Sequence, residues 1–258
     1  PNDTLFQFSG RTASEIRLVR PNNEDNYILG KYMNSNFSDK NDTDINFLAH
    51  FGEWQFAGVF DGMGGGNFGE LASYNAANIF LNKLSNITIE CSKMDIDYIV
   101  RLAFLQANNV MIDFQKSYNI AGTTGTLFCT NGHVFKIYHL GDSRAYHFHN
   151  NKLIQLTRDQ TLAQMKMDSG ITNIAETDRY KLIEYIGADW TRKNLKPTET
   201  AWIPVQSCDY FLLCSDGLYS LCTNHEIEQI LQKKIPIKEK TFRLVQRAIS
   251  KGGIDNVT

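Results

Sequence analysis

Apolar positions along the chain fall into short continuous runs and into longer runs with helical spacing. Helical spacing over 68–84 and 96–114 predicts two long helices, and two shorter ones are expected at 226–233 and 240–250. Short apolar runs, some joined by tight turns such as Asn131-Gly132, predict strands. The expected strands cover 15–19, 26–29, 54–60, 124–130, 134–140, 144–149, 152–156, 201–205 and 210–214. A stretch rich in Asn, Asp and Ser, Met33 to Asn46, is expected to be a loop.

These elements come in blocks of strands and blocks of helices rather than in strand–helix alternation. Such blocks favour antiparallel sheets covered by helices. The chain has 258 residues, 42% of them hydrophobic, which is enough for a sizeable core. No Pro-rich or Gly/Ser-rich linker divides the sequence, so residues 1–258 are expected to form one domain.

Charge and cysteine content narrow the possible partners and the compartment. The chain has 26 Lys and Arg residues and 28 Asp and Glu residues, so it has no excess of basic residues. A nucleic acid or a membrane surface is therefore not expected as a partner. The longest apolar stretches, such as 210–214, are too short to span a bilayer. The five cysteines are odd in number and form no CxxC pair, which argues against a disulfide scaffold and a cysteine zinc site. A reducing, cytoplasmic compartment is therefore expected.

The six histidines show no ligand pattern in the sequence. His147 and His149 are two residues apart, so they share one face of a strand. We expect them on an exposed hairpin rather than on a metal ion.

Acidic residues recur at the ends of apolar strands, next to glycine or another turn former. They lie at Glu24-Asp25, Asp61-Gly62, Gly141-Asp142, Asp216-Gly217 and Asp255-Asn256. Any one of these is a common turn, but five of them from distant segments predict a shared rim of a sheet. Clustered carboxylates repel one another unless a cation is present, and oxygen ligands suit Mg²⁺ or Mn²⁺.

Two further features add to this prediction. The glycines after Asp61 let the backbone approach closely, so the Gly62 carbonyl is a candidate ligand. The run is neither a P-loop nor a dinucleotide fingerprint. Arg20 lies four residues before Glu24, where a guanidinium beside a metal cluster would hold a phosphate in a bidentate fork. Taken alone, an ordinary solvated surface arginine is the favoured interpretation.

The motifs appear in the order of a known family. They are Arg20-Pro21-Asn22-Asn23-Glu24-Asp25, Val59-Phe60-Asp61-Gly62-Met63-Gly64-Gly65, Gly122-Thr123-Thr124, Gly141-Asp142-Ser143-Arg144, Leu156-Thr157-Arg158-Asp159, Cys214-Ser215-Asp216-Gly217-Leu218 and Gly253-Ile254-Asp255-Asn256-Val257-Thr258. The chain resembles the metal-dependent protein Ser/Thr phosphatases of type 2C, the PPM family. Met63 stands where animal members carry His, which indicates the bacterial branch.

The resemblance implies an α+β fold, a four-layer α-β-β-α sandwich of two antiparallel sheets flanked by helices. It also implies two Mn²⁺ or Mg²⁺ ions, and a weaker third. Asp61 would bridge the two ions, Asp216 and Asp255 would complete one site, and Glu24 with the Gly62 carbonyl would serve the other. Asp142 would belong to the third ion. Asp25 would orient the attacking water, and Arg20 would bind the substrate phosphate.

The implied activity is hydrolysis of phosphoserine and phosphothreonine in proteins by water that the two ions activate. Phosphoprotein substrates, an opposing Ser/Thr kinase and a monomeric state are expected. Residues 158–192 would form a flap beside the site. Relatives continue into one more strand, which the family pattern places after Thr258.

Two alternatives stay open on the sequence alone. Gln160 and Ser220 depart from the family pattern near the flap and the third ion, which allows a degenerate phosphatase fold that only binds a partner. The same centre would also serve a small phosphorylated metabolite.

Overall fold

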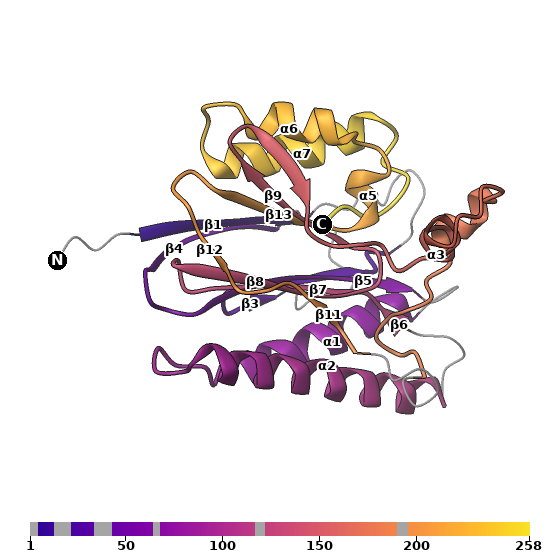
Figure 1. Ribbon diagram of the computed structural model, residues 1–258, viewed down its shortest axis with the longest axis horizontal. Helices are drawn as coiled ribbons and strands as arrows, with labels where there is room; N and C mark the ends of the chain where they lie inside the picture. Colours follow the sequence, from indigo (N-terminus) through magenta and orange to yellow (C-terminus); the bar gives the residue numbers. More distant parts are fainter. Residues whose placement is uncertain (1–4, 13–21, 34–42, 64–67, 117–121, 190–195) are drawn as a thin grey trace.

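The computed structural model describes residues 5–12, 22–33, 43–63, 68–116, 122–189 and 196–258. Two β-layers pack face to face, and a pair of helices covers the outer side of each layer (Figure 1). The α+β sandwich that the motifs imply is therefore confirmed.

The first β-layer is an antiparallel sheet of eight strands. Its main path runs β11 (Thr198–Glu199), β8 (Val134–Leu140), β7 (Gly125–Thr130), β5 (Gln55–Met63), β2 (Asp25–Leu29) and β3 (Tyr32–Met33). Off this path, β12 (Ile203–Pro204) pairs with β8, and β6 (Gly122–Thr123) pairs with β5.

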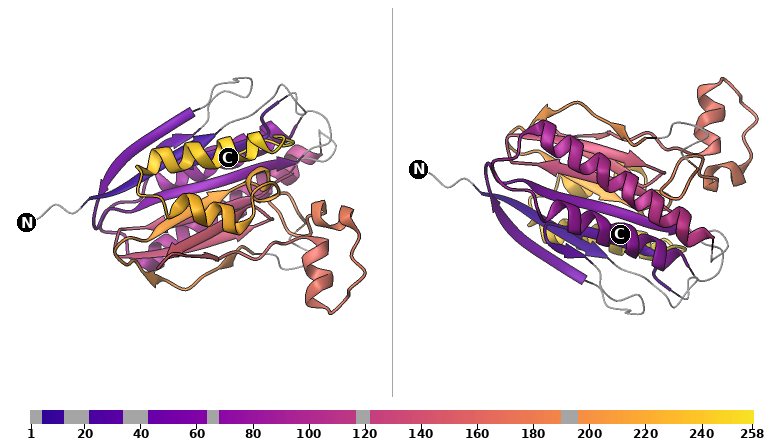
Figure 2. Two further views of the ribbon diagram at one scale, coloured as in Figure 1. Left: turned by 90° about the horizontal axis from the view of Figure 1, so that it is seen from above. Right: turned by 90° about the horizontal axis from the view of Figure 1, so that it is seen from below.

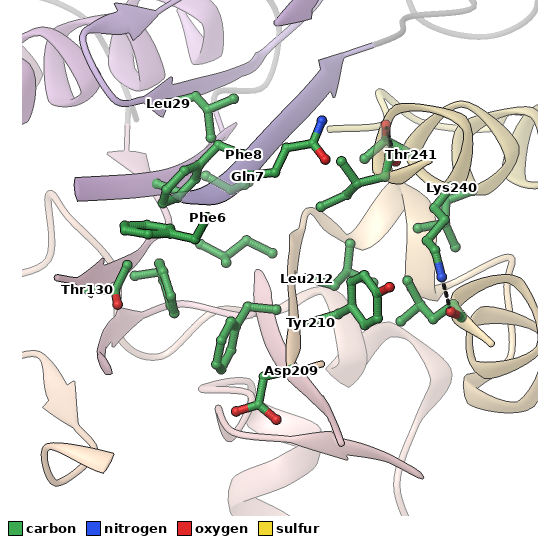
Figure 3. Close-up of a pocket in the computed structure, with 18 of the residues that line it drawn as sticks. Phe6, Gln7, Phe8, Leu29, Thr130, Asp209, Tyr210, Leu212, Lys240 and Thr241 are labelled. Atoms are coloured by element: carbon green, nitrogen blue, oxygen red, sulfur yellow. Dashed lines mark hydrogen bonds between the residues drawn. The ribbon is translucent and has the colours of Figure 1, made fainter. Parts of the chain in front are cut away.

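The second β-layer has two parts. One is the sheet β10 (Lys152–Gln155), β9 (Arg144–His149) and β13 (Tyr210–Cys214), and the other pairs β1 (Leu5–Thr12) with β4 (Thr43–His50). Among the described residues, β1 pairs only with β4 and β13 only with β9. A cavity of about 490 Å³ lies between these two parts (Figure 3). It is lined by Phe6, Phe8 and Leu212, and by Lys240 and Thr241 of helix α7 (Ile237–Ser250). The further strand that the family pattern implies stays a prediction.

Helices cover both outer faces. Helices α1 (Gly69–Leu84) and α2 (Lys93–Gln115) cover the first sheet, and α6 (Asn224–Leu231) and α7 (Ile237–Ser250) cover the second layer (Figures 1 and 2). The short α5 (Asp216–Tyr219) follows β13, while α3 (Leu162–Asp168) and the 3₁₀ helix η1 (Glu176–Tyr180) project from one end of the sandwich.

The observed bounds differ from the expected ones in the loop at 33–46 and at the start of α2. The loop expected over 33–46 is wrong at its end, because β4 begins at Thr43 and pairs with β1 along eight residues. Ile45 and Phe47 alternate along β4 and pack against the core, but the polar residues before them hid this strand pattern. Helix α2 begins three residues earlier than expected, since Ser92 and Asp95 form a capping box at its start. The strand expected at 15–19 lies outside the described residues.

The core under α1 and α2 is built on aromatic side chains. Phe80 of α1 is fully buried, with its ring centroid 5.2 Å from that of Phe60 and 4.7 Å from that of Phe104. These rings join α1, α2 and β5, and β5 carries the acidic motif. The core therefore holds the strand that presents Asp61.

Replacing Phe80 by Ala should lower the free energy of unfolding by about 3–5 kcal/mol, because the ring leaves a cavity that its neighbours cannot fill. Urea unfolding followed by circular dichroism measures this change. Met94→Ala on the same helix layer is the control, since Met94 is 81% exposed and should change stability by less than about 0.5 kcal/mol. Equal losses in both variants would contradict this description of the core.

Candidate metal centre

Carboxylates from distant segments meet at one end of the sandwich. The antiparallel pairing of β2 with β5 sets Asp25 directly opposite Asp61. The charges that act on the Asp61 carboxyl come from other carboxylates, namely Asp25, Asp216, Asp142 and Asp255. The strand ends singled out in the sequence are therefore brought together in space.

Burial and mutual repulsion shift the pKa values of these groups. Burial raises the pKa of Asp61 well above its ordinary value, and the charge of Asp25 raises it further. The pKa of Asp25 is likewise raised by burial, although a hydrogen bond from Ser215 opposes the shift. Burial raises the pKa of Asp142 to about 8, helped by the charge of Asp216. Such a cluster favours a bound cation at neutral pH.

Hydroxyl groups on neighbouring strands fix the Asp61 backbone. The Asp61 amide donates to Thr124 Oγ1 over 2.9 Å, and the Asp61 carbonyl accepts from the Thr124 amide and from Thr123 Oγ1. Thr124 Oγ1 also lies 2.7 Å from Ser143 Oγ, next to Asp142. One hydroxyl network thus positions the β5 and β8 ends of the cluster.

A second network joins residues 22–25 to the last residues of the chain. Ser215 Oγ donates to Asp25 Oδ2 over 2.7 Å, and the Thr258 amide donates to Ser215 Oγ over 3.2 Å. Asn256 Oδ1 accepts from the Glu24 amide over 2.9 Å, while Asn256 Nδ2 donates to the carbonyl of Asn22. These hydrogen bonds therefore hold together the backbone segments that carry Glu24, Asp25, Asp216 and Asp255.

Two glycines allow oxygen atoms to crowd at the start of α1. A Cβ atom on Gly69 would lie 2.8 Å from Glu24 Oε1 and 2.9 Å from the Gly62 carbonyl oxygen. Both oxygens therefore face the same point. A Cβ atom on Gly62 would overlap the Gly69 carbonyl, so neither position accepts a larger residue. With carboxylates alone beside it, this donor set fits a hard divalent cation such as Mn²⁺ or Mg²⁺.

The loop that carries Asp142 has its own supports. Gln160 Oε1 accepts from the Gly141 amide over 2.7 Å, and the Gln160 amide donates to the Gly141 carbonyl over 2.8 Å. Arg144 forms a bidentate pair with Asp159 and stacks on the ring of Tyr219 at 3.7 Å. Gln160, a departure from the family pattern, thus has a structural part in holding this loop.

The structure gathers most of the residues expected at the site, but their roles as ligands stay predictions. Arg20 lies outside the described residues. Sequence reasoning did not single out four supporting residues, which are Thr124, Ser143, Ser215 and Asn256. Their position inside the quoted motifs was the available signal, because each directly follows or precedes an acidic or glycine position.

His147 and His149 lie on the expected hairpin, formed by β9 and β10, but they are less exposed than expected. Their side chains are 15% and 24% exposed, and both reach the carboxylate of Asp209. Among the described residues, these three form the one group of His, Cys, Asp or Glu whose ligand atoms all lie within 4.8 Å of one another. Asp209 carries no motif, and only the strand register brings it to the histidines.

Comparison with known proteins gives the family. The family model for protein phosphatase 2C matches residues 9–166. The chain belongs to the protein phosphatase 2C family. The chain is 30% identical over 209 residues to the serine/threonine phosphatase stp of Listeria welshimeri, covering 78% of this chain and 81% of that protein. It is 29% identical over 251 residues to the phosphatase PstP of Mycobacterium tuberculosis, covering 95% of this chain and 43% of that protein.

Solved structures agree with this family. The catalytic domain of PstP in complex with two manganese ions is similar, with a TM-score of 0.72, 26% identity and coverage of 98% of this chain and 96% of that one. The Streptococcus agalactiae phosphatase shares the fold with a TM-score of 0.81, at 19% identity and coverage of 98% and 97%. The recognition of a bacterial-type member of the family is confirmed. None of the described helices is both long enough and apolar enough to cross a membrane.

Replacing Asp142 by Asn should stabilise the metal-free protein in a pH-dependent way. The folded-state pKa of about 8 exceeds the ordinary value of 3.8, so folding is favoured while Asp142 is protonated and loses that contribution as pH rises toward 8. The gain in the variant should be near zero at pH 4 and about 1–3 kcal/mol at pH 8. Urea unfolding in chelator at several pH values measures it. Asp113→Asn, at an exposed position on α2, is the control, and a pH-independent gain for Asp142→Asn would contradict the assignment.

Proposed function

We propose that this chain hydrolyses phosphoserine and phosphothreonine in proteins, with two Mn²⁺ or Mg²⁺ ions held by the acidic cluster. The observation that carries the proposal is the convergence of Asp25, Asp216 and Asp255 on Asp61. Support also comes from relatives named as serine/threonine phosphatases and from the PstP complex with two manganese ions.

The proposed ligands divide into two sets. Asp61 would contact both ions, Asp216 and Asp255 would complete one site, and Glu24 with the Gly62 carbonyl would serve the other. The shared orientation of Glu24 Oε1 and the Gly62 oxygen supports the second set. Asp142, whose pKa is raised in part by the charge of Asp216, is proposed to bind a weaker third ion.

The ions, when bound, supply positive charge that acidifies water and neutralises phosphoryl oxygens. The protein's own residues hold the reactants in position. Asp25 would accept a hydrogen bond from the attacking water, and the hydrogen bond from Ser215 Oγ to Asp25 Oδ2 holds its carboxylate in place. Arg20 binds the substrate phosphate through charge-assisted hydrogen bonds. Met63 has no proton to donate, so the leaving oxygen takes its proton from solvent within the site.

Residues 158–189 lie beside this centre and are proposed to contact the substrate. Thr123, next to the Asp61 carbonyl, exchanges two backbone hydrogen bonds with Ile186 of this segment. The segment is thus attached to the centre at a fixed point, while α3 projects away from it (Figure 2). An opposing Ser/Thr kinase, a monomeric state and a cytoplasmic location stay predictions.

Phosphate release from a phosphothreonine peptide should require Mn²⁺ or Mg²⁺. Chelator should reduce the rate to background, and added Mn²⁺ should restore it, because the carboxylates alone offer no positive charge to the phosphoryl group. A malachite green assay of released phosphate measures this. Hydrolysis that persists in chelator would overturn the proposal. Turnover of a small phosphorylated metabolite but not of phosphopeptides would favour the metabolite alternative, and no turnover with bound Mn²⁺ would favour a binding module.

Two variants should separate chemistry from phosphate binding. Asp216→Asn should lower kcat by at least about 100-fold, because it removes a charge that holds the ions. Arg20→Ala should raise KM by about 10- to 100-fold, the value of one or two charge-assisted hydrogen bonds. Asp113→Asn, exposed on α2, is the matched carboxylate control and should leave both constants unchanged. Full activity of Asp216→Asn would refute the ligand assignment.

A further inference from the structure

A second group of metal-ligand side chains lies far from the acidic cluster. Strands β9 and β13 pair antiparallel with Phe148 opposite Tyr210, so the same register sets His149 opposite Asp209. His147 lies on the same face of β9, one diagonal step away. Sequence spacing does not show this meeting, because 60 residues separate His149 from Asp209.

The ligand atoms of these side chains converge on one carboxylate oxygen. His149 Nδ1 lies 2.6 Å and His147 Nε2 lies 3.0 Å from Asp209 Oδ1. His147 Nε2 is buried and lies off the direction of a hydrogen bond, so it has no hydrogen-bond partner. The Asp209 side chain is 1% exposed. A buried carboxylate oxygen with two imidazole nitrogens within 3.0 Å, one of them without a hydrogen-bond partner, is a donor set that a cation would complete.

Neighbouring groups hold the side chains of His147 and Asp209 in place. The ring of His147 stacks on Phe211 with centroids 4.9 Å apart and planes inclined by 12°, and it meets Phe135 edge-on at 5.5 Å. The Gln206 amide donates to Asp209 Oδ2 over 2.8 Å, which turns Oδ1 toward the histidines. Outer contacts of this kind orient metal ligands in known sites. Figure 3 shows the Asp209 carboxylate turned away from the apolar side chains that line the cavity.

The donor chemistry differs from that of the acidic cluster. Two imidazole nitrogens and one carboxylate oxygen suit Zn²⁺, whereas Mn²⁺ and Mg²⁺ favour oxygen ligands. Ligands of a tetrahedral Zn²⁺ with bonds near 2.0–2.1 Å stand roughly 3.3 Å apart, so the contacts at 2.6 and 3.0 Å need only small rotations. Three ligands leave one position open.

We propose that His147, His149 and Asp209 bind one Zn²⁺ ion at the end of the second β-layer opposite to the acidic cluster. Asp142 and Asp216 flank the other ends of β9 and β13, and the six residues of β9, five steps from Arg144 to His149, span about 17 Å. The ion joins β9 to β13 and stabilises this end of the sheet. It takes no part in phosphate hydrolysis, so the inference does not depend on the proposed function.

The test is Zn²⁺ binding to the whole chain with the acidic cluster saturated by Mn²⁺. Isothermal titration calorimetry should show one Zn²⁺ per chain at this site, and Zn²⁺ should raise the thermal midpoint of unfolding. Co²⁺ in place of Zn²⁺ should give the visible absorption of a four-coordinate site with nitrogen and oxygen ligands. Because metal binding requires neutral imidazoles, acid should release the ion.

Variants identify the ligands. Asp209→Asn and His149→Gln should each weaken Zn²⁺ binding by at least about 100-fold and abolish the stabilisation by Zn²⁺. Asp209→Asn keeps an acceptor for Gln206, and His149 is the more exposed histidine, so both variants should fold. Cys208→Ser, beside Asp209, and His225→Gln, an exposed histidine on α6, are matched controls that should bind as the parent does.

Other outcomes would overturn the proposal. Unchanged Zn²⁺ affinity in Asp209→Asn and His149→Gln, or equal loss in Cys208→Ser, shows that the ligand set is wrong. Zn²⁺ binding that disappears in Asp216→Asn places the ion in the acidic cluster instead. Affinity no better than millimolar shows that the three side chains form only a hydrogen-bonded group.

Discussion

The antiparallel pairing of β2 with β5 is the contact on which the acidic centre depends. It sets Asp25 opposite Asp61 across the sheet, closer than two like charges would lie if they were free to separate. Strand pairing, the aromatic core under α1 and α2, and the hydroxyl network around Thr124 supply the stability that offsets this repulsion. The fold is therefore stabilised away from the centre and strained electrostatically within it, which is the usual relation between a scaffold and a reactive site.

The acidic centre and the histidine group lie at opposite ends of the same two strands. Strands β9 and β13 run from His149 and Asp209 at one end to Asp142 and Asp216 at the other. The two ends differ in donor type, because one is made of carboxylate and carbonyl oxygens and the other contains imidazoles. If both proposals hold, cations of different hardness would bind at different places within one fold.

The sequence allowed the layered fold and the family to be predicted, because strand and helix blocks and ordered motifs are local features. It also marked Asp61, Asp216 and Asp255, since each lies at a strand end beside a turn former. It contained the alternating apolar residues Ile45 and Phe47 of β4, but it could not reveal that this strand pairs with β1, because the pairing of distant segments depends on the whole fold. Asp209 was missed for a similar reason, because its partners are set by register between β9 and β13 rather than by spacing along the chain.

Thr123 connects the segment 158–189 to the strand that carries Asp61. Its backbone exchanges hydrogen bonds with Ile186, while its hydroxyl donates to the carbonyl of Asp61. A shift of the Ile186 backbone therefore pulls on the peptide that carries Asp61 through a single intervening residue. Under the proposed function, a protein bound against residues 158–189 would contact a segment that a single residue joins to the carbonyl of Asp61.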